Sequence, residues 1–125
     1  MIKLIPEKIV WINEDRTMAH TLFSKNELGT LTKVTLDDVW TNYFKCDNEY
    51  HLFNPKLVAE GLKRIKGRRE CFLLEDSNNI LAIFSRKSEG CILIAPIIEN
   101  DRRVVESRIY ERHTSVFIPR RFLKN

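Results

Sequence analysis

The chain has 125 residues, of which 43% are hydrophobic and 30% are charged, with a formal net charge of +4. A chain of this length and composition can bury a hydrophobic core without disulfides or metals, which excludes an intrinsically disordered protein and predicts a single domain over residues 1–125. The absence of a signal-peptide core or of an apolar run of about 18 residues predicts a soluble, cytoplasmic protein without membrane contact.

The N-terminal third contains one predicted strand and one predicted helix. Residues 1–12, MIKLIPEKIVWI, predict a strand with Pro6 at its edge or in a bulge, because proline cannot donate a ladder hydrogen bond. Residues 13–25 predict a weaker helix, and the threonines in this stretch make a strand the alternative. The apolar face of that helix would comprise Met18, Ala19, Leu22 and Phe23.

A second helix is predicted to begin at Thr35, whose hydroxyl can cap the first turn. Asp37 and Asp38 complement the positive end of the helix dipole, which explains this acidic pair without catalysis. The apolar face of this helix comprises Leu36, Val39, Trp40, Tyr43 and Phe44. Because these side chains follow the 3.6-residue period, we interpret the aromatic face as core packing rather than as a base-stacking platform.

The clearest predicted element is a helix over residues 54–67, NPKLVAEGLKRIKG. Asn54 can cap its N-terminus, Pro55 suits its first turn, and Gly67 stands where a C-terminal cap requires a positive φ. The apolar side of this helix comprises Leu57, Val58, Gly61, Leu62 and Ile65.

From residue 70 the pattern changes to β-structure. Residues 70–88 predict two strands around the turn DSNN, and residues 91–98 predict a third, buried strand. Residues 102–112 fit either a strand or a helix, with a slight preference for a strand, and residues 116–119 are predicted to be extended because they lead into Pro119. Helices followed by hairpins predict an α+β fold, with two or three N-terminal helices packed on a C-terminal antiparallel sheet of about four strands.

The positive charge is concentrated in two basic clusters. Five of the six charged residues between positions 61 and 70 are cations, as are seven of the nine between positions 102 and 125. If the fold brings the clusters together, they can bind the RNA or DNA backbone in a salt-dependent manner. The predicted binding residues are Lys63, Arg64, Lys66, Arg68 and Arg69 in the first cluster, and Arg102, Arg103, Arg120 and Arg121 in the second.

Two alternatives to nucleic-acid binding follow from the same residues. The first is an inhibitor or immunity-type module that binds an acidic protein through cations and exposed aromatics such as Trp40, Tyr50 or Phe53. The second is a metal-independent ribonuclease of toxin type, which needs an acid, a base and cations near the phosphate. Its candidate catalytic residues are His113, Arg112 and Arg108. Adjacent residues of a strand point to opposite faces, which separates His113 from Arg112 and favours binding over cleavage.

The sequence contains no motif for a nucleotide, a metal or a disulfide framework. The four glycines are scattered, so no glycine-rich phosphate loop is predicted. The three cysteines lack paired spacing, which predicts buried thiols at positions 71 and 91 rather than a disulfide framework. The side chains that could bind zinc, without zinc spacing, are Cys46, His51, Cys71, Cys91 and His113. We therefore expect neither a metal nor a small-molecule cofactor.

Overall fold

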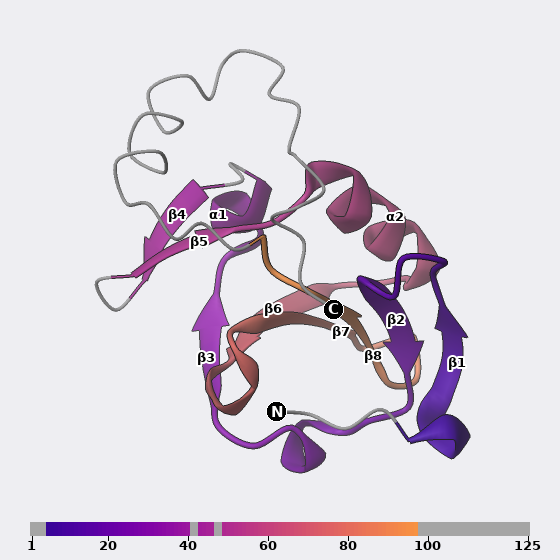
Figure 1. Ribbon diagram of the computed structural model, residues 1–125. Coiled ribbons are helices and arrows are strands. Elements are labelled where there is room, and N and C mark those ends of the chain that lie inside the picture. Colours follow the sequence, from indigo (N-terminus) through magenta and orange to yellow (C-terminus); the bar gives the residue numbers. More distant parts are fainter. Residues whose placement is uncertain (1–4, 41–42, 47–48, 98–125) are drawn as a thin grey trace.

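The computed structural model describes residues 5–40, 43–46 and 49–97. Its main feature is a six-stranded antiparallel sheet with strand order β1-β2-β8-β7-β6-β3 (Figure 1). The strands of this sheet are β1 (Ile9–Ile12), β2 (Met18–Thr21), β3 (Leu31–Val34), β6 (Arg69–Leu74), β7 (Ile80–Ser85) and β8 (Cys91–Ile94). The other elements are a hairpin of β4 (Tyr43–Cys46) and β5 (Glu49–Leu52), the helices α1 (Leu36–Trp40) and α2 (Pro55–Arg64), and the 3-10 turns η1 (Pro6–Lys8), η2 (Lys25–Glu27) and η3 (Glu75–Ser77).

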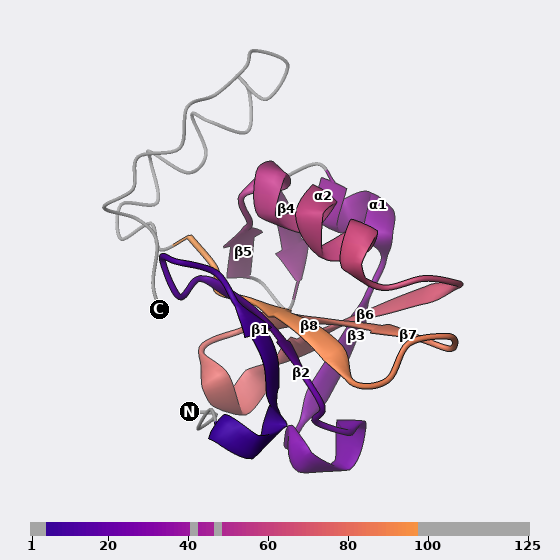
Figure 2. The ribbon, with the colours of Figure 1, turned by 90° about the vertical axis from the view of Figure 1, so that its right-hand side faces the viewer.

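Each face of the sheet carries its own apolar core. Figure 2 shows α1, α2 and the β4–β5 hairpin on one side of the sheet and the segment with η2 on the other. The core under the helices contains Met18, Val34, Val39, Phe53, Val58, Ile65, Cys71, Leu73, Leu81, Ile83, Ile92 and Ile94. The core under η2 contains Phe23, Leu28, Leu74, Ala82, Cys91 and Leu93. Residues of β6, β7 and β8 alternate between the two cores, as the two-residue period of a strand requires.

Helix α2 confirms the prediction for residues 54–67, although its C-terminus is formed differently. Asn54 caps the N-terminus by accepting a hydrogen bond of 2.9 Å from the backbone N–H of Lys56. The helix stops at Arg64, and the Arg69 guanidinium donates to the carbonyls of Leu62 at 2.6 Å and Ile65 at 2.9 Å. Gly67 does have a positive φ of 91°, but it lies beyond the helix, so the last carbonyls are satisfied by arginine rather than by a glycine cap.

The predicted fold class, with two or three N-terminal helices on a sheet of about four strands, is wrong. Among the described helices only α2 is longer than five residues, and the sheet has six strands. The predicted helix over residues 13–25 is replaced by β2, which pairs with β1 and β8. Asn13 closes the turn before β2, because its side-chain oxygen accepts from the backbone N–H groups of Thr17 and Met18 at 2.8 and 2.9 Å. This turn uses the competing side-chain-to-backbone bonding that disfavours a helix at asparagine.

The helix predicted to begin at Thr35 is only partly correct. The Thr35 hydroxyl caps α1 by accepting from the backbone N–H of Asp38 at 3.1 Å. However, α1 ends at Trp40, and Tyr43 begins β4. Tyr43 and Phe44 therefore do not extend the apolar face of this helix. They belong to strand β4, whereas Val39 belongs to α1, and side chains follow a different period in a strand than in a helix.

The predicted strands of the described C-terminal half are confirmed. The β6–β7 hairpin turns at DSNN, where Asn78 and Asn79 have φ values of 55° and 58°, a conformation that asparagine tolerates. β8 is fully buried, and β1 is an edge strand with a register shift between Ile9 and Trp11. Pro6 lies in η1, just before β1. The predictions for residues 102–112 and 116–119 lie outside the described residues.

None of the helices in the described part of the chain has the length and apolar character needed to cross a bilayer.

Candidate functional site

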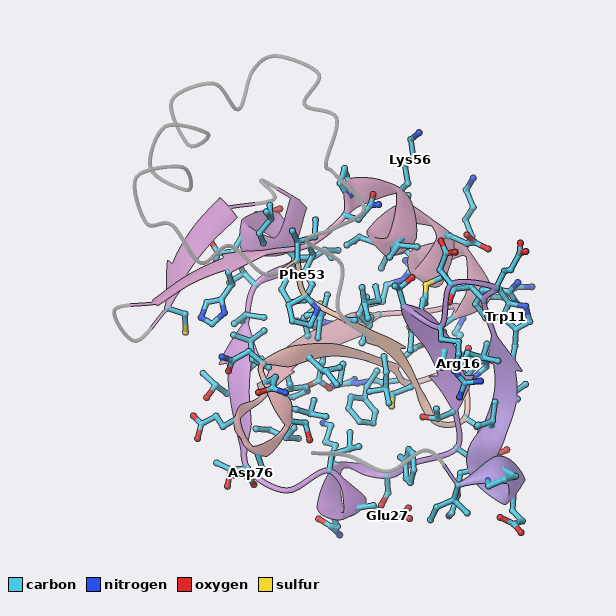
Figure 3. All side chains as sticks on the ribbon, viewed as in Figure 1. Trp11, Arg16, Glu27, Phe53, Lys56 and Asp76 are labelled. Carbon is cyan, nitrogen blue, oxygen red and sulfur yellow. The ribbon has the colours of Figure 1, made fainter. Side chains whose placement is uncertain are left out.

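The first basic cluster lies at the C-terminal end of α2 and the start of β6, and two of its five residues have structural partners. Arg64 pairs with Glu60 at 3.8 Å, and its guanidinium carbon lies 3.4 Å from the centroid of the Trp11 ring. Figure 3 shows Trp11 at the β1 side of the molecule, so this contact joins α2 to β1. Arg69 holds the last carbonyls of α2. Both guanidinium groups therefore contact other parts of the fold at this end of the helix.

The other three cations of the first cluster, Lys63, Lys66 and Arg68, are exposed. Among the described residues, none of the three forms an ion pair. Lys66 is fixed through its backbone: its carbonyl accepts a hydrogen bond from the Ser85 hydroxyl, and its N–H donates to the Ser88 hydroxyl at 2.9 Å. The loop between α2 and β6 is therefore fastened to the end of β7 and the turn that follows it.

This arrangement adds two cations that the sequence reasoning missed, Arg86 and Lys87. Arg69 pairs with Ser85 across the β6–β7 ladder, and the backbone N–H of Arg86 donates to the carbonyl of Arg68 at 3.4 Å. The register thus continues by one step and places Arg68 opposite Arg86. Residues directly opposite in an antiparallel pair have Cβ atoms about 4.5–5.5 Å apart, and like charges in that position are destabilising.

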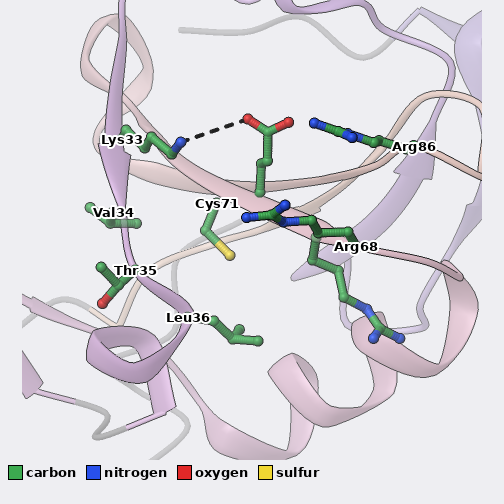
Figure 4. Close-up of a pocket in the computed structure, with 9 residues that line it drawn as sticks. Lys33, Val34, Thr35, Leu36, Arg68, Cys71 and Arg86 are labelled. Atoms are coloured by element: carbon green, nitrogen blue, oxygen red, sulfur yellow. Dashed lines mark ion pairs between the residues drawn. The ribbon is translucent and has the colours of Figure 1, made fainter.

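A pocket of about 540 Å³ opens at this point between β3, the start of α1 and the start of β6 (Figure 4). We call it the basic pocket, because the described residues that line it include four cations and one carboxylate. Its charged lining residues are Lys33, Arg68, Arg69, Arg86 and Glu70, and the rest of its wall consists of Val34, Thr35, Leu36 and Cys71. Lys33 is another residue that the sequence reasoning missed, since β3 itself was not predicted.

Glu70, the carboxylate among the described residues of the basic pocket, is shared by two lysines. Its Oε2 atom lies 3.6 Å from the Lys25 ammonium and 3.9 Å from the Lys33 ammonium. Within the described part of the chain, Arg68 and Arg86 form no ion pair. Because Glu70 is shared by the two lysines, the described lining of the basic pocket carries a net positive charge.

The thiol in the pocket wall is not a nucleophile at neutral pH. Burial raises the pKa of Cys71 to about 11, and burial likewise raises the pKa of Cys91 to about 11. Both thiols are buried and free, as predicted for them. Since the thiolate is the reactive form, the basic pocket offers cationic and hydrogen-bonding chemistry instead.

The candidate zinc ligands do not converge where the structure describes them. Over residues 5–40, 43–46 and 49–97, no three His, Cys, Asp or Glu side chains are grouped to hold a metal ion. His51 is buried. His113, the remaining candidate, lies outside these ranges.

Seven of the predicted functional residues belong to the C-terminal part of the chain. All four predicted residues of the second cluster (Arg102, Arg103, Arg120 and Arg121) and the ribonuclease candidates (Arg108, Arg112 and His113) lie outside the described residues. Convergence of the two basic clusters therefore stays a prediction.

Of the aromatics proposed as interface anchors, Phe53 is fully buried in the core, so its predicted exposure is wrong. Figure 3 shows Phe53 in the interior.

Comparisons with protein-family models, with curated proteins and with solved structures find no match for this chain.

Proposed function

We propose that the protein is a small basic module that binds the backbone of a nucleic acid, with a phosphate group held in the basic pocket. The observation that carries this proposal is the pair of facing arginines, Arg68 and Arg86, neither of which has a carboxylate partner in the described chain. Guanidinium groups form bidentate, charge-assisted hydrogen bonds with phosphate oxygens. A bound phosphate would attract both guanidinium groups and so offset the repulsion between them.

The cations around the pocket extend this surface. Lys63, Lys66 and Lys87 are exposed, and the Lys87 side chain lies against the Gly67 backbone. Each phosphate that they neutralise would release counterions, so the binding should weaken steeply as the salt concentration rises. The cations of the second cluster would add further phosphate contacts if they lie on the same side.

The proposal is tested by neutralising the facing arginines. The double variant Arg68→Gln/Arg86→Gln should bind fluorescein-labelled RNA and DNA more weakly at low salt, as measured by fluorescence anisotropy. Loss of two phosphate contacts should also lower the slope of log K against log salt by about two.

The matched control is Lys8→Gln/Lys56→Gln, which makes the same change in net charge away from the pocket. Lys8 pairs with Glu27, and Lys56 lies in the first turn of α2. This control should keep nearly all of the affinity. Equal losses in both double variants would show that only the overall charge matters and would refute a site at the pocket.

A second candidate function, a metal-independent ribonuclease, gains support from Glu70. Its carboxylate lines the same pocket as Arg68 and Arg86. A carboxylate can accept the proton of an RNA 2′-hydroxyl while that oxygen attacks phosphorus, and neighbouring cations stabilise the charge on the phosphorane. The leaving 5′-oxygen needs a proton from an acid, and His113 is the candidate that the sequence offers.

A further inference from the structure

Two phenylalanines lie next to the basic pocket, on the same face of the sheet as Arg68 and Arg86. Phe72 of β6 and Phe84 of β7 form an edge-to-face pair with ring centroids 5.9 Å apart and an interplanar angle of 76°. Phe84 lies opposite Glu70, and Phe72 lies opposite Lys33 of β3. Because alternate residues share a face, positions 68, 70 and 72 of one strand and 84 and 86 of the other form one continuous surface.

The side chain of Lys25 lies over both rings of this aromatic pair. The Lys25 ammonium lies 4.8 Å from the centroid of the Phe72 ring and 5.5 Å from that of Phe84. The same ammonium pairs with Glu70, and the Lys25 side chain is 45% exposed. Exposed ion pairs and cation–π contacts each contribute little to stability, so a ligand can displace this side chain at small cost.

This face of the sheet therefore presents two arginines, Arg68 and Arg86, beside the two phenylalanine rings. Cations that track a backbone, combined with rings on which successive bases stack, are the common features of proteins that bind single strands. The bases of a duplex are already stacked on one another and cannot reach two half-buried rings. An unpaired base of a single strand can reach these rings.

We propose that the nucleic acid bound by this protein is single-stranded, with bases stacked on Phe72 and Phe84 and the adjoining phosphate between Arg68 and Arg86. This inference rests on the proposed function and makes it more specific. In the complex, a base takes the place of the Lys25 ammonium over the rings. The displaced ammonium then lies close to the incoming phosphates and can pair with one of them.

The experiment compares single strands with duplexes. The variants Phe72→Leu and Phe84→Leu keep an apolar side chain, which matters because Phe84 also packs against the core under η2. Each should weaken binding of short single-stranded RNA or DNA roughly tenfold, since one base loses its stacking partner. Duplex binding and the salt slope should stay unchanged. Trp11→Leu is the matched control, because it removes another aromatic ring with a cation contact at the β1 side of the molecule.

The outcomes separate this inference from the proposed function. Loss of single-strand binding in the phenylalanine variants and not in Trp11→Leu supports the stacking surface. Unchanged single-strand affinity in both phenylalanine variants overturns it, while weaker binding of every nucleic acid by the Arg68→Gln/Arg86→Gln variant would still support the proposed function. If neither set of variants changes the affinity, both proposals fail. Separate RNA and DNA probes show which sugar is preferred.

A second measurement uses the unaltered protein and so does not depend on how the variants fold. A single strand carrying 5-bromouracil is bound, irradiated and digested, and the crosslinked residue is found by mass spectrometry. Stacked bases should crosslink to Phe72 or Phe84. Crosslinks found only at other residues would overturn the stacking surface.

Discussion

Replacing the neighbouring arginines at the start of β6, Arg68 and Arg69, should affect two different properties of the protein. Arg69 donates two hydrogen bonds to the last carbonyls of α2, to Leu62 at 2.6 Å and to Ile65 at 2.9 Å. Arg68 faces Arg86 across the β6–β7 ladder and has no ion pair within the described residues. We therefore expect Arg69→Gln to reduce stability and Arg68→Gln to reduce binding.

The size of the stability effect follows from the two hydrogen bonds. A hydrogen bond to a charged group contributes about 1.5–3 kcal/mol. The Arg69 side chain is at the surface, so water can replace it at both carbonyls, and the net loss should be about 1–2 kcal/mol for the pair. For a chain of this size, that loss corresponds to a decrease in Tm of roughly 3–10 °C.

Arg68→Gln removes one member of a like-charged cross-strand pair. Its free energy of unfolding should therefore be unchanged or higher by a few tenths of a kcal/mol, as expected for relief of such repulsion.

Urea denaturation and thermal melting measure the stabilities of both variants, and fluorescence anisotropy at low salt measures their affinities for RNA and DNA. If Arg69→Gln is as stable as the unaltered protein but binds weakly, the Arg69 guanidinium serves the ligand rather than the helix end. A destabilised Arg68→Gln variant with full affinity would contradict the role given to the facing arginines. Either result would refute the division of the first cluster into structural and binding residues.

Three further predictions concern pH, cleavage and the second cluster. Burial raises the pKa of the Cys71 and Cys91 thiols from 9.0 to about 11. Their contribution to the free energy of unfolding should therefore be constant below pH 9 and fall between pH 9 and 11, where the unfolded chain loses these protons and the folded chain keeps them. Equilibrium unfolding at several pH values tests this, and replacing either cysteine with alanine should make the decline smaller. If the ribonuclease candidate is correct, the protein should degrade RNA in the presence of a chelator, and Glu70→Gln or His113→Ala should stop it; RNA that stays intact at high protein concentration removes this candidate. Reversing the charges of Arg120 and Arg121 should weaken nucleic-acid binding at low salt and leave Tm nearly unchanged, whereas unaltered affinity would exclude the second cluster from the interface.

The elements that the sequence predicted correctly are those whose signals are local. Asn54 and Pro55 mark the start of α2 within two residues, and the DSNN turn joins two strands that are adjacent in the chain. By contrast, β2 lies between β1 and β8, and its Thr21 pairs with Cys91. Such contacts between distant residues decide whether a short threonine-containing stretch becomes a strand, and a local pattern does not contain that information.

The same distinction explains which parts of the candidate site were predicted. The first basic cluster is contiguous in the chain, so its existence was evident, but the roles of its members were not. Arg64 and Arg69 were assigned to binding, although their partners come from Trp11 and from the end of α2. Arg86 could have been placed beside the cluster from the register of the predicted hairpin, whereas Lys33 required the unpredicted pairing of β3 with β6.

The segment between β2 and β3 determines where the apolar core stops and the candidate binding surface begins. Phe23 and Leu28 of this segment cover Leu74 and Ala82 on the face of the sheet opposite the helices. Further along the same face, Lys25 is the side chain over the two phenylalanine rings, and beyond it lies the basic pocket. One strand, β6, thus runs from a fully buried end at Leu74 to an exposed, cationic start. At that exposed start, hydrogen bonds join the loop before β6 to the end of β7 and the turn after it. The backbone that carries the facing arginines is therefore held by the fold, which reduces the ordering cost of binding a phosphate there.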